Sequence, residues 1–243
     1  MNLEELLEHI GTYLDDRHDL VDGDPDELWS DALIVRSLNQ GQRIHARRAW
    51  SIVDEGHTTA GVIVLKTGVA VYPLHRSVLR VLMATPSDQD WPLGRSSDAI
   101  LRLAQPKFDA PYDLNGASVE TGRPLAFATD AATRTMRIFR TPTSTENGLK
   151  VNLKVARLPV EWLDIGNTDG EPEIPDEYHL DLADYACGRC LTQPTVDGQG
   201  KTDGRELLTN FNAAVMEARR DRQRAEMEPG PWVFASSTAV LDG

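Results

Sequence analysis

Long apolar runs and a basic leader are both missing from this sequence of 243 residues. No apolar stretch reaches the roughly 18 residues that a membrane-spanning helix needs. The first residues, MNLEELLEHIGTYLDD, are acidic and amphipathic, whereas a secretion signal begins with a basic segment followed by an apolar one. We therefore expect no membrane partner, and a protein made in the cytosol, where thiols stay reduced.

Aromatic residues and cysteines are also scarce. Aromatics make up 6% of the chain, and cysteine occurs only at Cys187 and Cys190. Apolar residues still reach 40% and charged residues 26%, which is ordinary for a globular protein of this length. The chain can therefore bury a sizeable core, and that core should be mostly aliphatic.

Positive charge is in short supply. The 38 acidic residues outnumber the 25 Lys and Arg residues, for a net charge of −13. Such a surface repels phosphates and argues against tight nucleic-acid binding, but it suits a protein that nucleic acid must slide past. Basic residues cluster at 43–50 and 218–224, in helical patterns with acids nearby. We interpret both clusters as solvated or ion-paired helix faces.

Helical patterns occupy both ends of the chain. Apolar spacing predicts a helix over 3–14, and Asp24 with Pro25 predicts the start of a second that runs to about Val53. Pro175 opens a helix to about Leu191. A last helix, capped by Asp203, carries one apolar stripe of Leu207, Leu208, Phe211, Val215 and Ala218.

Strand patterns fill the middle of the chain. Residues 58–74 and 77–85 are rich in β-branched side chains, with a loop over 85–95, and 123–130, 133–142 and 148–159 predict three more strands. The order predicts an α+β fold, in which a helical bundle domain carries an inserted antiparallel β domain. The expected boundaries are 1–56 and 166–228 for the helical domain, 57–165 for the β domain, and 229–243 for an extended C-terminal tail.

Cys187 and Cys190 form a C-x-x-C pair that has three readings: a redox pair, half of a metal site, or two small residues on one packed helix face. A thioredoxin-type pair opens a helix, where the helix dipole stabilises a thiolate. This pair lies at the far end of a predicted helix, where the dipole raises a thiol pKa. No second cysteine pair completes a zinc site. We therefore favour two buried, inert thiols.

No other motif indicates catalysis. The stretch TVDGQGKT (195–202) ends like a phosphate-binding loop, but Thr195 replaces the first glycine and the stretch follows a helix; a polar turn is the better interpretation. The six histidines are scattered and form no ligand pair. The sequence therefore predicts no enzyme, and no catalytic, cofactor-binding or metal-binding residue.

Three stretches carry a resemblance to a known family. They are DPDELWSDALIVRSLNQGQRIHARRAW (24–50), the strand region RPLAFATDAATRTMRIFRTP with LKVNLKVARLPVEWL, and PEIPDEYHLDLADYACGRCL (172–191). Their succession resembles the head-to-tail adaptor (connector) proteins of short-tailed bacteriophages. In that family a small helix residue, often alanine, takes the place of Cys190, so the resemblance also implies an inert pair.

The resemblance implies a structural protein of the virion, made in the host bacterial cytoplasm. Copies would form a dodecameric ring beneath the portal protein, extend the DNA channel and offer a platform to the tail (nozzle or tail tube) protein. Genomic DNA would pass through without specific binding. Two alternatives remain open: a cytosolic thiol or redox protein that uses Cys187 and Cys190, and another phage neck or tail component such as a stopper or terminator.

The last 15 residues contain one apolar group, Trp232, Val233 and Phe234, among prolines and small residues. Aromatic anchors in pockets dominate many interfaces, and a flexible tail can order when it docks. These three residues are therefore candidate partner-binding residues. The competing interpretation is a loose chain end with incidental apolar residues.

Overall fold

The structure, a computed structural model, describes residues 1–14, 29–96, 121–130, 132–193, 196 and 198–227. Its helices are α1 (Leu3–Tyr13), α2 (Asp31–Ala49), α4 (His179–Leu191) and α5 (Gly198–Met227), and the 3-10 helix η1 (Asp176–Tyr178) leads into α4. Its strands are β1 (Val53–Glu55), β2 (Val62–Val64), β3 (Val71–Pro73), β4 (Val78–Pro86), β5 (Gly94–Arg95), β6 (Ala126–Asp130), β7 (Thr135–Phe139) and β8 (Lys150–Arg157).

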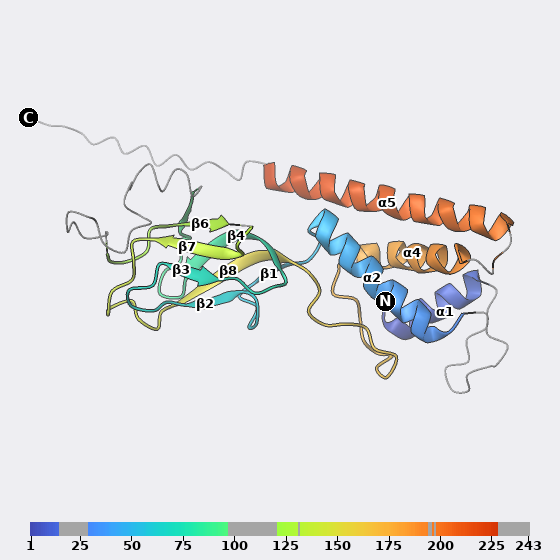
Figure 1. The fold of residues 1–243 in the computed structure, drawn as a ribbon, viewed down its shortest axis with the longest axis horizontal. Helices are drawn as coiled ribbons and strands as arrows, with labels where there is room; N and C mark the ends of the chain where they lie inside the picture. The colour runs from blue at the N-terminus through green and yellow to red at the C-terminus, as the bar shows by residue number, and fades with distance from the viewer. Residues whose placement is uncertain (15–28, 97–120, 131, 194–195, 197, 228–243) are drawn as a thin grey trace, which may run out of the picture.

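The helices gather at one end of the molecule and the strands at the other (Figure 1). Because α1 and α2 precede the strands while α4 and α5 follow them, the helical end is built from both ends of the chain. This arrangement confirms the predicted α+β fold with an inserted β part. The exact domain boundaries, at residues 57 and 165, stay a prediction.

The helices share one apolar core in which α4 is the central element. The helix packs against α1, α2 and α5. The predicted apolar stripe of α1 is buried, and the side chain of Asn2 and that of Glu5 cap its first turn reciprocally. On α5, four residues of the predicted stripe are buried in the same core: Leu207, Phe211, Val215 and Ala218. Helical spacing therefore located this core correctly.

Two glycines allow α4 and α5 to approach closely. A Cβ atom built on Gly188 would lie 2.8 Å from Cγ of Leu208 and 2.9 Å from the carbonyl oxygen of Gly204. A Cβ atom on Gly204 would lie 2.8 Å from Cβ of Leu191. Only residues without a side chain fit this crossing, because a backbone oxygen cannot move out of the way.

Strand β8 organises the first sheet. β4 pairs along one edge of β8, while β1 and β2 pair with successive parts of its other edge, all antiparallel. Side chains alternate along β8 as predicted, so that Val151, Leu153 and Val155 are buried. The second sheet has the order β3-β7-β6-β5, and only β5 runs parallel to its neighbour. Phe127, Met136 and Ile138 from this sheet complete a second core.

The structure corrects two predicted helix starts. α2 begins at Asp31 with Ser30 as the N-cap residue, so the helix does not run on from Pro25; Asp24 itself lies outside the described residues. α5 begins at Gly198, so Asp203 does not cap it. Instead, the Asp203 carboxylate accepts a hydrogen bond from Gln199 one turn earlier, which helps the polar stretch to continue the helix.

The end of α2 is also earlier than predicted. The helix stops at Ala49, and Trp50 takes a left-handed conformation with φ of 55°. Val53, which was expected in the helix, instead opens β1 because its backbone pairs with Ala156 of β8. The short β5 lies within the predicted loop 85–95 and was not expected.

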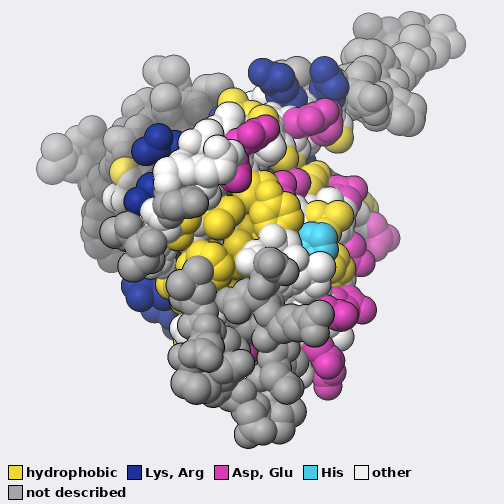
Figure 2. All heavy atoms as spheres, turned by 90° about the vertical axis from the view of Figure 1, so that its right-hand side faces the viewer, with side chains coloured by type: hydrophobic (Ala, Val, Ile, Leu, Met, Phe, Trp, Pro, Cys, Tyr) yellow, Lys and Arg dark blue, Asp and Glu magenta, His cyan; other side chains and the backbone are white. Residues whose placement is uncertain are grey.

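Seen from its helical end, the molecule separates its charges. Acidic side chains gather along the right flank and Lys and Arg side chains along the left flank, whereas both kinds lie near the upper edge (Figure 2). Part of the surface is therefore basic, although the net charge of the chain is −13.

The close crossing of α4 and α5 predicts a specific sensitivity to side-chain size. Gly188→Val should lower the free energy of unfolding by about 2 kcal/mol or more, because the added methyl groups overlap a backbone oxygen. Gly198→Val is the matched control, since no atom lies within 4 Å of a Cβ at that position. Urea unfolding of both variants measures the difference; equal midpoints would show that the helices do not approach this closely.

Candidate docking surface

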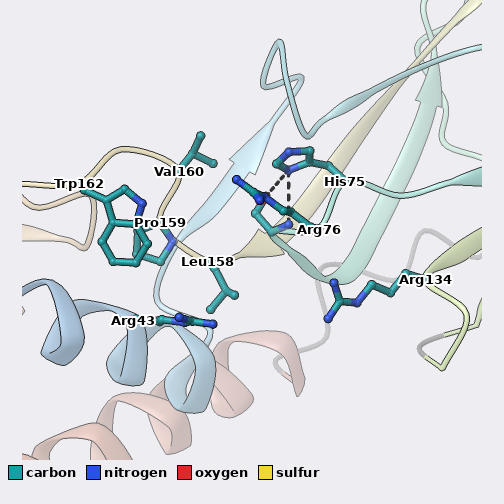
Figure 3. Close-up of a pocket in the computed structure, with 9 residues that line it drawn as sticks. Arg43, His75, Arg76, Arg134, Leu158, Pro159, Val160 and Trp162 are labelled. Atoms are coloured by element: carbon teal, nitrogen blue, oxygen red, sulfur yellow. Dashed lines mark hydrogen bonds between the residues drawn. The ribbon is translucent and has the colours of Figure 1, made fainter.

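An arginine-lined cleft opens between α2 and the strands. One part has a volume of about 550 Å³, and its lining includes Arg43 and Arg47 of α2, Arg76 of the β3–β4 loop and Arg134 of the β6–β7 turn. An adjoining part of about 340 Å³ shares three of these arginines and ends at Trp162. Figure 3 shows Arg43 and Arg134 extending toward the same gap from different elements, with Leu158 between them.

The cleft has an unbalanced charge. Arg80 and Arg95 also line it, and Asp130 is the only carboxylate among the lining residues described. The guanidinium groups of Arg43, Arg47, Arg76 and Arg134 form no hydrogen bond or ion pair within the part of the chain that the structure describes. Guanidinium groups held this way attract carboxylates or phosphates, which they bind in a bidentate manner.

Exposed apolar side chains border this cleft. Trp162 is 52% exposed and Ile165 is 47% exposed, and both lie in the connector that follows β8. They also line a shallow groove of about 710 Å³ against α2, together with Arg36 and Arg43. Tryptophan and arginine are enriched at the centres of protein interfaces. The combined surface therefore has the composition of a docking site.

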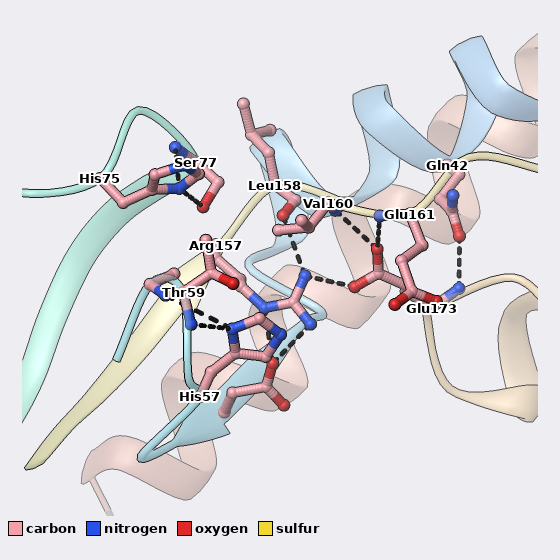
Figure 4. Close-up of polar contacts among 12 residues, drawn as sticks. Gln42, His57, Thr59, His75, Ser77, Arg157, Leu158, Val160, Glu161 and Glu173 are labelled. Carbon is pink, nitrogen blue, oxygen red and sulfur yellow. Dashed lines mark hydrogen bonds and ion pairs between the residues drawn. The ribbon is translucent and has the colours of Figure 1, made fainter. Parts of the chain in front are cut away.

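A buried ion-pair network centred on Arg157 and Glu173 lies at the junction of the strands and the connector (Figure 4). The guanidinium of Arg157 donates through Nε to Oδ2 of Asp54 at 2.5 Å, and its Nη1 donates to the carbonyl of Leu158 and to Oε2 of Glu173. The other carboxylate oxygen of Glu173 accepts the backbone N–H groups of Val160 and Glu161, each at 2.5 Å. The Arg157 side chain is only 6% exposed, so its partners neutralise a buried charge.

The same network reaches α2. Oε1 of Gln42 accepts the backbone N–H of Glu173 at 2.5 Å, which ties the connector to the helix. Nearby, the guanidinium groups of Arg80 and Arg219 lie 5.0 and 5.3 Å from the ring centre of Trp50. These cation–π contacts connect β4 and α5 to Trp50, which caps the end of α2.

The predicted thiol pair does not lie in this surface. Cys187 and Cys190 occupy the last part of α4, and their side chains are 3% and 0% exposed. Burial, with smaller effects from Cys190 and Asp184, raises the pKa of the Cys187 thiol to about 12. A thiol with this pKa stays protonated at neutral pH and is a poor nucleophile. The geometry agrees with the interpretation of an inert, packed pair.

The TVDGQGKT stretch and the buried histidine His179 also have structural roles in the fold. Residues 198–202 of the stretch TVDGQGKT form the first turns of α5, so the polar turn expected there is wrong, and they form no phosphate-binding loop. His179 is buried, with Nε2 3.0 Å from the carbonyl of Ile174 and Nδ1 3.0 Å from the amino group of Met1. Among the residues described, no group of three His, Cys, Asp or Glu side chains is placed to hold a metal ion.

His45 is a second buried histidine. Its Nδ1 lies 3.0 Å from the hydroxyl oxygen of Ser51, and its ring centre lies 4.5 Å from that of Tyr178. Burial lowers the pKa of His45 to about 4, so the ring is neutral at physiological pH. This histidine therefore packs the junction of α2 with η1 and carries no charge there.

The sequence did not single out the cleft or the Arg157 network, although one signal was present. Arg157 continues the two-residue alternation of Val151, Leu153 and Val155, so the pattern places an arginine on the buried face of a strand. A buried arginine requires carboxylate partners. The expected solvated face at 43–50 is correct in that Arg43 and Arg47 are exposed, but their convergence with Arg76 and Arg134 depends on tertiary structure.

The proposed tail anchor, Trp232 to Phe234, lies outside the described residues. Within them, no helix combines the length and apolar character needed to cross a membrane.

The fold therefore combines a helical core and a β-rich core with a charged cleft that exposed apolar side chains border. Comparison with protein-family models identifies the family. Residues 1–234 match the SU10 adaptor protein family, so the chain belongs to this family of phage head-to-tail adaptors. The resemblance drawn from the sequence is thereby confirmed, and the protein has a structural adaptor role in the virion. No curated protein matches the chain.

The buried thiols give a prediction that separates the adaptor from a thiol enzyme. In the native protein at pH 8, both cysteines should react with an aromatic disulfide reagent far more slowly than in guanidinium chloride, where they are exposed. Because the folded pKa of Cys187 is raised, its contribution to stability is complete below the unfolded pKa of about 8.5 and is lost as pH rises toward 12. Rapid labelling of the native protein at pH 8 would instead indicate a reactive thiolate.

Proposed function

We propose that this protein is the head-to-tail adaptor that forms a ring beneath the portal protein, extends the DNA channel and offers the tail its attachment platform. The observation that supports the proposal is the family match over residues 1–234, nearly the whole chain. The ring is expected to be dodecameric, and the tail-side partner to be the nozzle or tail tube protein. Synthesis in the host cytoplasm precedes assembly into the virion.

The described surface suits a protein that works by docking. The Arg157 network fixes how the helices and the strands meet, so a subunit can present both parts to its neighbours in a constant geometry. A net charge of −13 repels phosphates, which allows a genome to pass through a ring without being held. No enzymatic step is needed for either task.

Sedimentation velocity tests the proposal directly. The full-length protein should form a large complex of fixed stoichiometry when it is mixed with the portal protein encoded by the same phage. Matching mixtures with an unrelated phage portal serve as the control. A protein that stays small beside its own portal would refute the adaptor assignment. A ring of different symmetry, bound to the tail and not to the portal, would identify a stopper or terminator.

The C-terminal anchor provides a second test. We propose that Trp232, Val233 and Phe234 dock into a pocket of the portal. Trp232→Ala combined with Phe234→Ala should then weaken portal binding roughly tenfold or more, because buried aromatic anchors carry a large share of interface energy. Ser236→Ala and Ser237→Ala together form a control in the same segment. Undiminished binding of the Trp232 and Phe234 variant, measured by titration against immobilised portal, would exclude the anchor.

A further inference from the structure

A second charged surface lies on the helices and is acidic. On α5, Asp203, Glu206 and Glu217 recur at helical spacing along one face. On α4, Asp181 and Asp184 lie one turn apart. The charges of Asp184 and Glu217 raise the pKa of the Asp181 carboxyl, after the larger effect of burial, so carboxylates of both helices share this surface. We call these five residues the acidic stripe.

Tyr13, the last residue of α1, lies near the carboxylates of the same surface. Burial raises the pKa of Tyr13, and smaller contributions come from the charges of Cys187, Asp184, Asp203 and Glu206. The side chain of Tyr13 is 53% exposed. The stripe is thus a mixed acidic and aromatic face, to which three helices contribute.

Charges of one sign predominate on both the acidic stripe and the arginine cleft, although Asp130 also lines the cleft and the charge of His9 lowers the pKa of Asp184, which burial raises more strongly. The four arginines Arg43, Arg47, Arg76 and Arg134 repel one another across a concave surface, and the carboxylates of the stripe do the same on theirs. Figure 2 shows acidic side chains on one flank of the helical end and basic side chains on the opposite flank. A closed ring requires two different, complementary surfaces on each subunit that face opposite neighbours.

We propose that the arginine cleft of one copy receives the acidic stripe of the next copy around the ring. This inference rests on the proposed ring and names the contact that closes it. Each interface would join guanidinium groups to carboxylates and would relieve both like-charge repulsions. In a closed ring, each subunit would receive the stripe of one neighbour in its cleft and would place its own stripe in the cleft of the other neighbour.

Size argues for a side-chain occupant and against a DNA duplex. The cleft volumes of about 550 and 340 Å³ fall in the range of sites for small ligands and short chain segments. A duplex presents phosphates along a rod whose major groove alone is roughly 12 Å wide. Carboxylate side chains on a helix fit the recess better than this rod does.

Charge reversal with complementation tests the contact in the full-length protein. One variant combines Arg43→Glu with Arg134→Glu, and the other combines Glu206→Lys with Glu217→Lys; all four positions are exposed. Each variant alone should form roughly a tenth or less of the ring complex that the wild-type protein forms with portal. An equimolar mixture of the two should restore it, because each reversed cleft then meets a reversed stripe and each native cleft a native stripe. Arg205→Glu, an exposed change on α5 outside both the cleft and the stripe, is the control and should assemble normally.

The outcomes separate this contact from the adaptor role itself. If wild-type protein forms no complex with portal, the proposed function and the ring contact both fail. If wild-type protein assembles and the cleft variant assembles equally well, the function stands and the contact is refuted. Loss of assembly that the mixture does not restore, in variants whose circular dichroism is unchanged, also refutes it. Retention of duplex DNA by wild type but not by the cleft variant, with rings of normal size, would assign the cleft to nucleic acid.

Discussion

The buried ion pairs of Arg157 are the constraint on which the rest of the molecule depends. The chain passes between its two cores twice, once after Ala49 and once after Arg157, and Arg157 binds a carboxylate on each passage through Asp54 and Glu173. Removal of one partner from a buried pair costs about 3–5 kcal/mol, because the other charge stays in a poorly solvated site. Removal of Asp54 or Glu173 would therefore strongly destabilise the junction, whether or not the intact ion pairs add net stability.

The cleft is a product of this junction. One wall comes from α2, which belongs to the helical core, and the others come from the β3–β4 loop and the β6–β7 turn. Arg157 and Arg43 illustrate two uses of the same residue type. The first is buried and fully neutralised by its own chain, whereas the second is exposed and has no anionic partner among the residues described. The ion pairs of Arg157 therefore stabilise the junction within the chain, whereas the charge of Arg43 stays available to a neighbouring molecule.

Periodic patterns predicted the elements well, but they could not predict how elements meet. The stripe from Leu207 to Ala218 and the alternation in β8 depend only on local geometry, and both are confirmed. The start of α5 differs from the prediction because Gly198 and Gly200 favour a turn, whereas Gln199 donates a hydrogen bond to Asp203 within the added helical turn. The cleft was missed because Arg43, Arg76 and Arg134 are distant in sequence and converge only in the folded chain. Arg157 was detectable, since it continues a buried alternation.

The insertion of the strands between the two halves of the helical core has a consequence for synthesis on the ribosome. Strand β8 ends at Arg157, so both sheets are complete in the emerging chain before α4, which begins at His179, has been made. α1 and α2 both pack against α4, and α2 also packs against α5. Their partner therefore arrives on the order of ten seconds after they do, at ordinary bacterial elongation rates. During that interval the helical core exists only as an exposed half, and its closure is the last event in the maturation of the subunit.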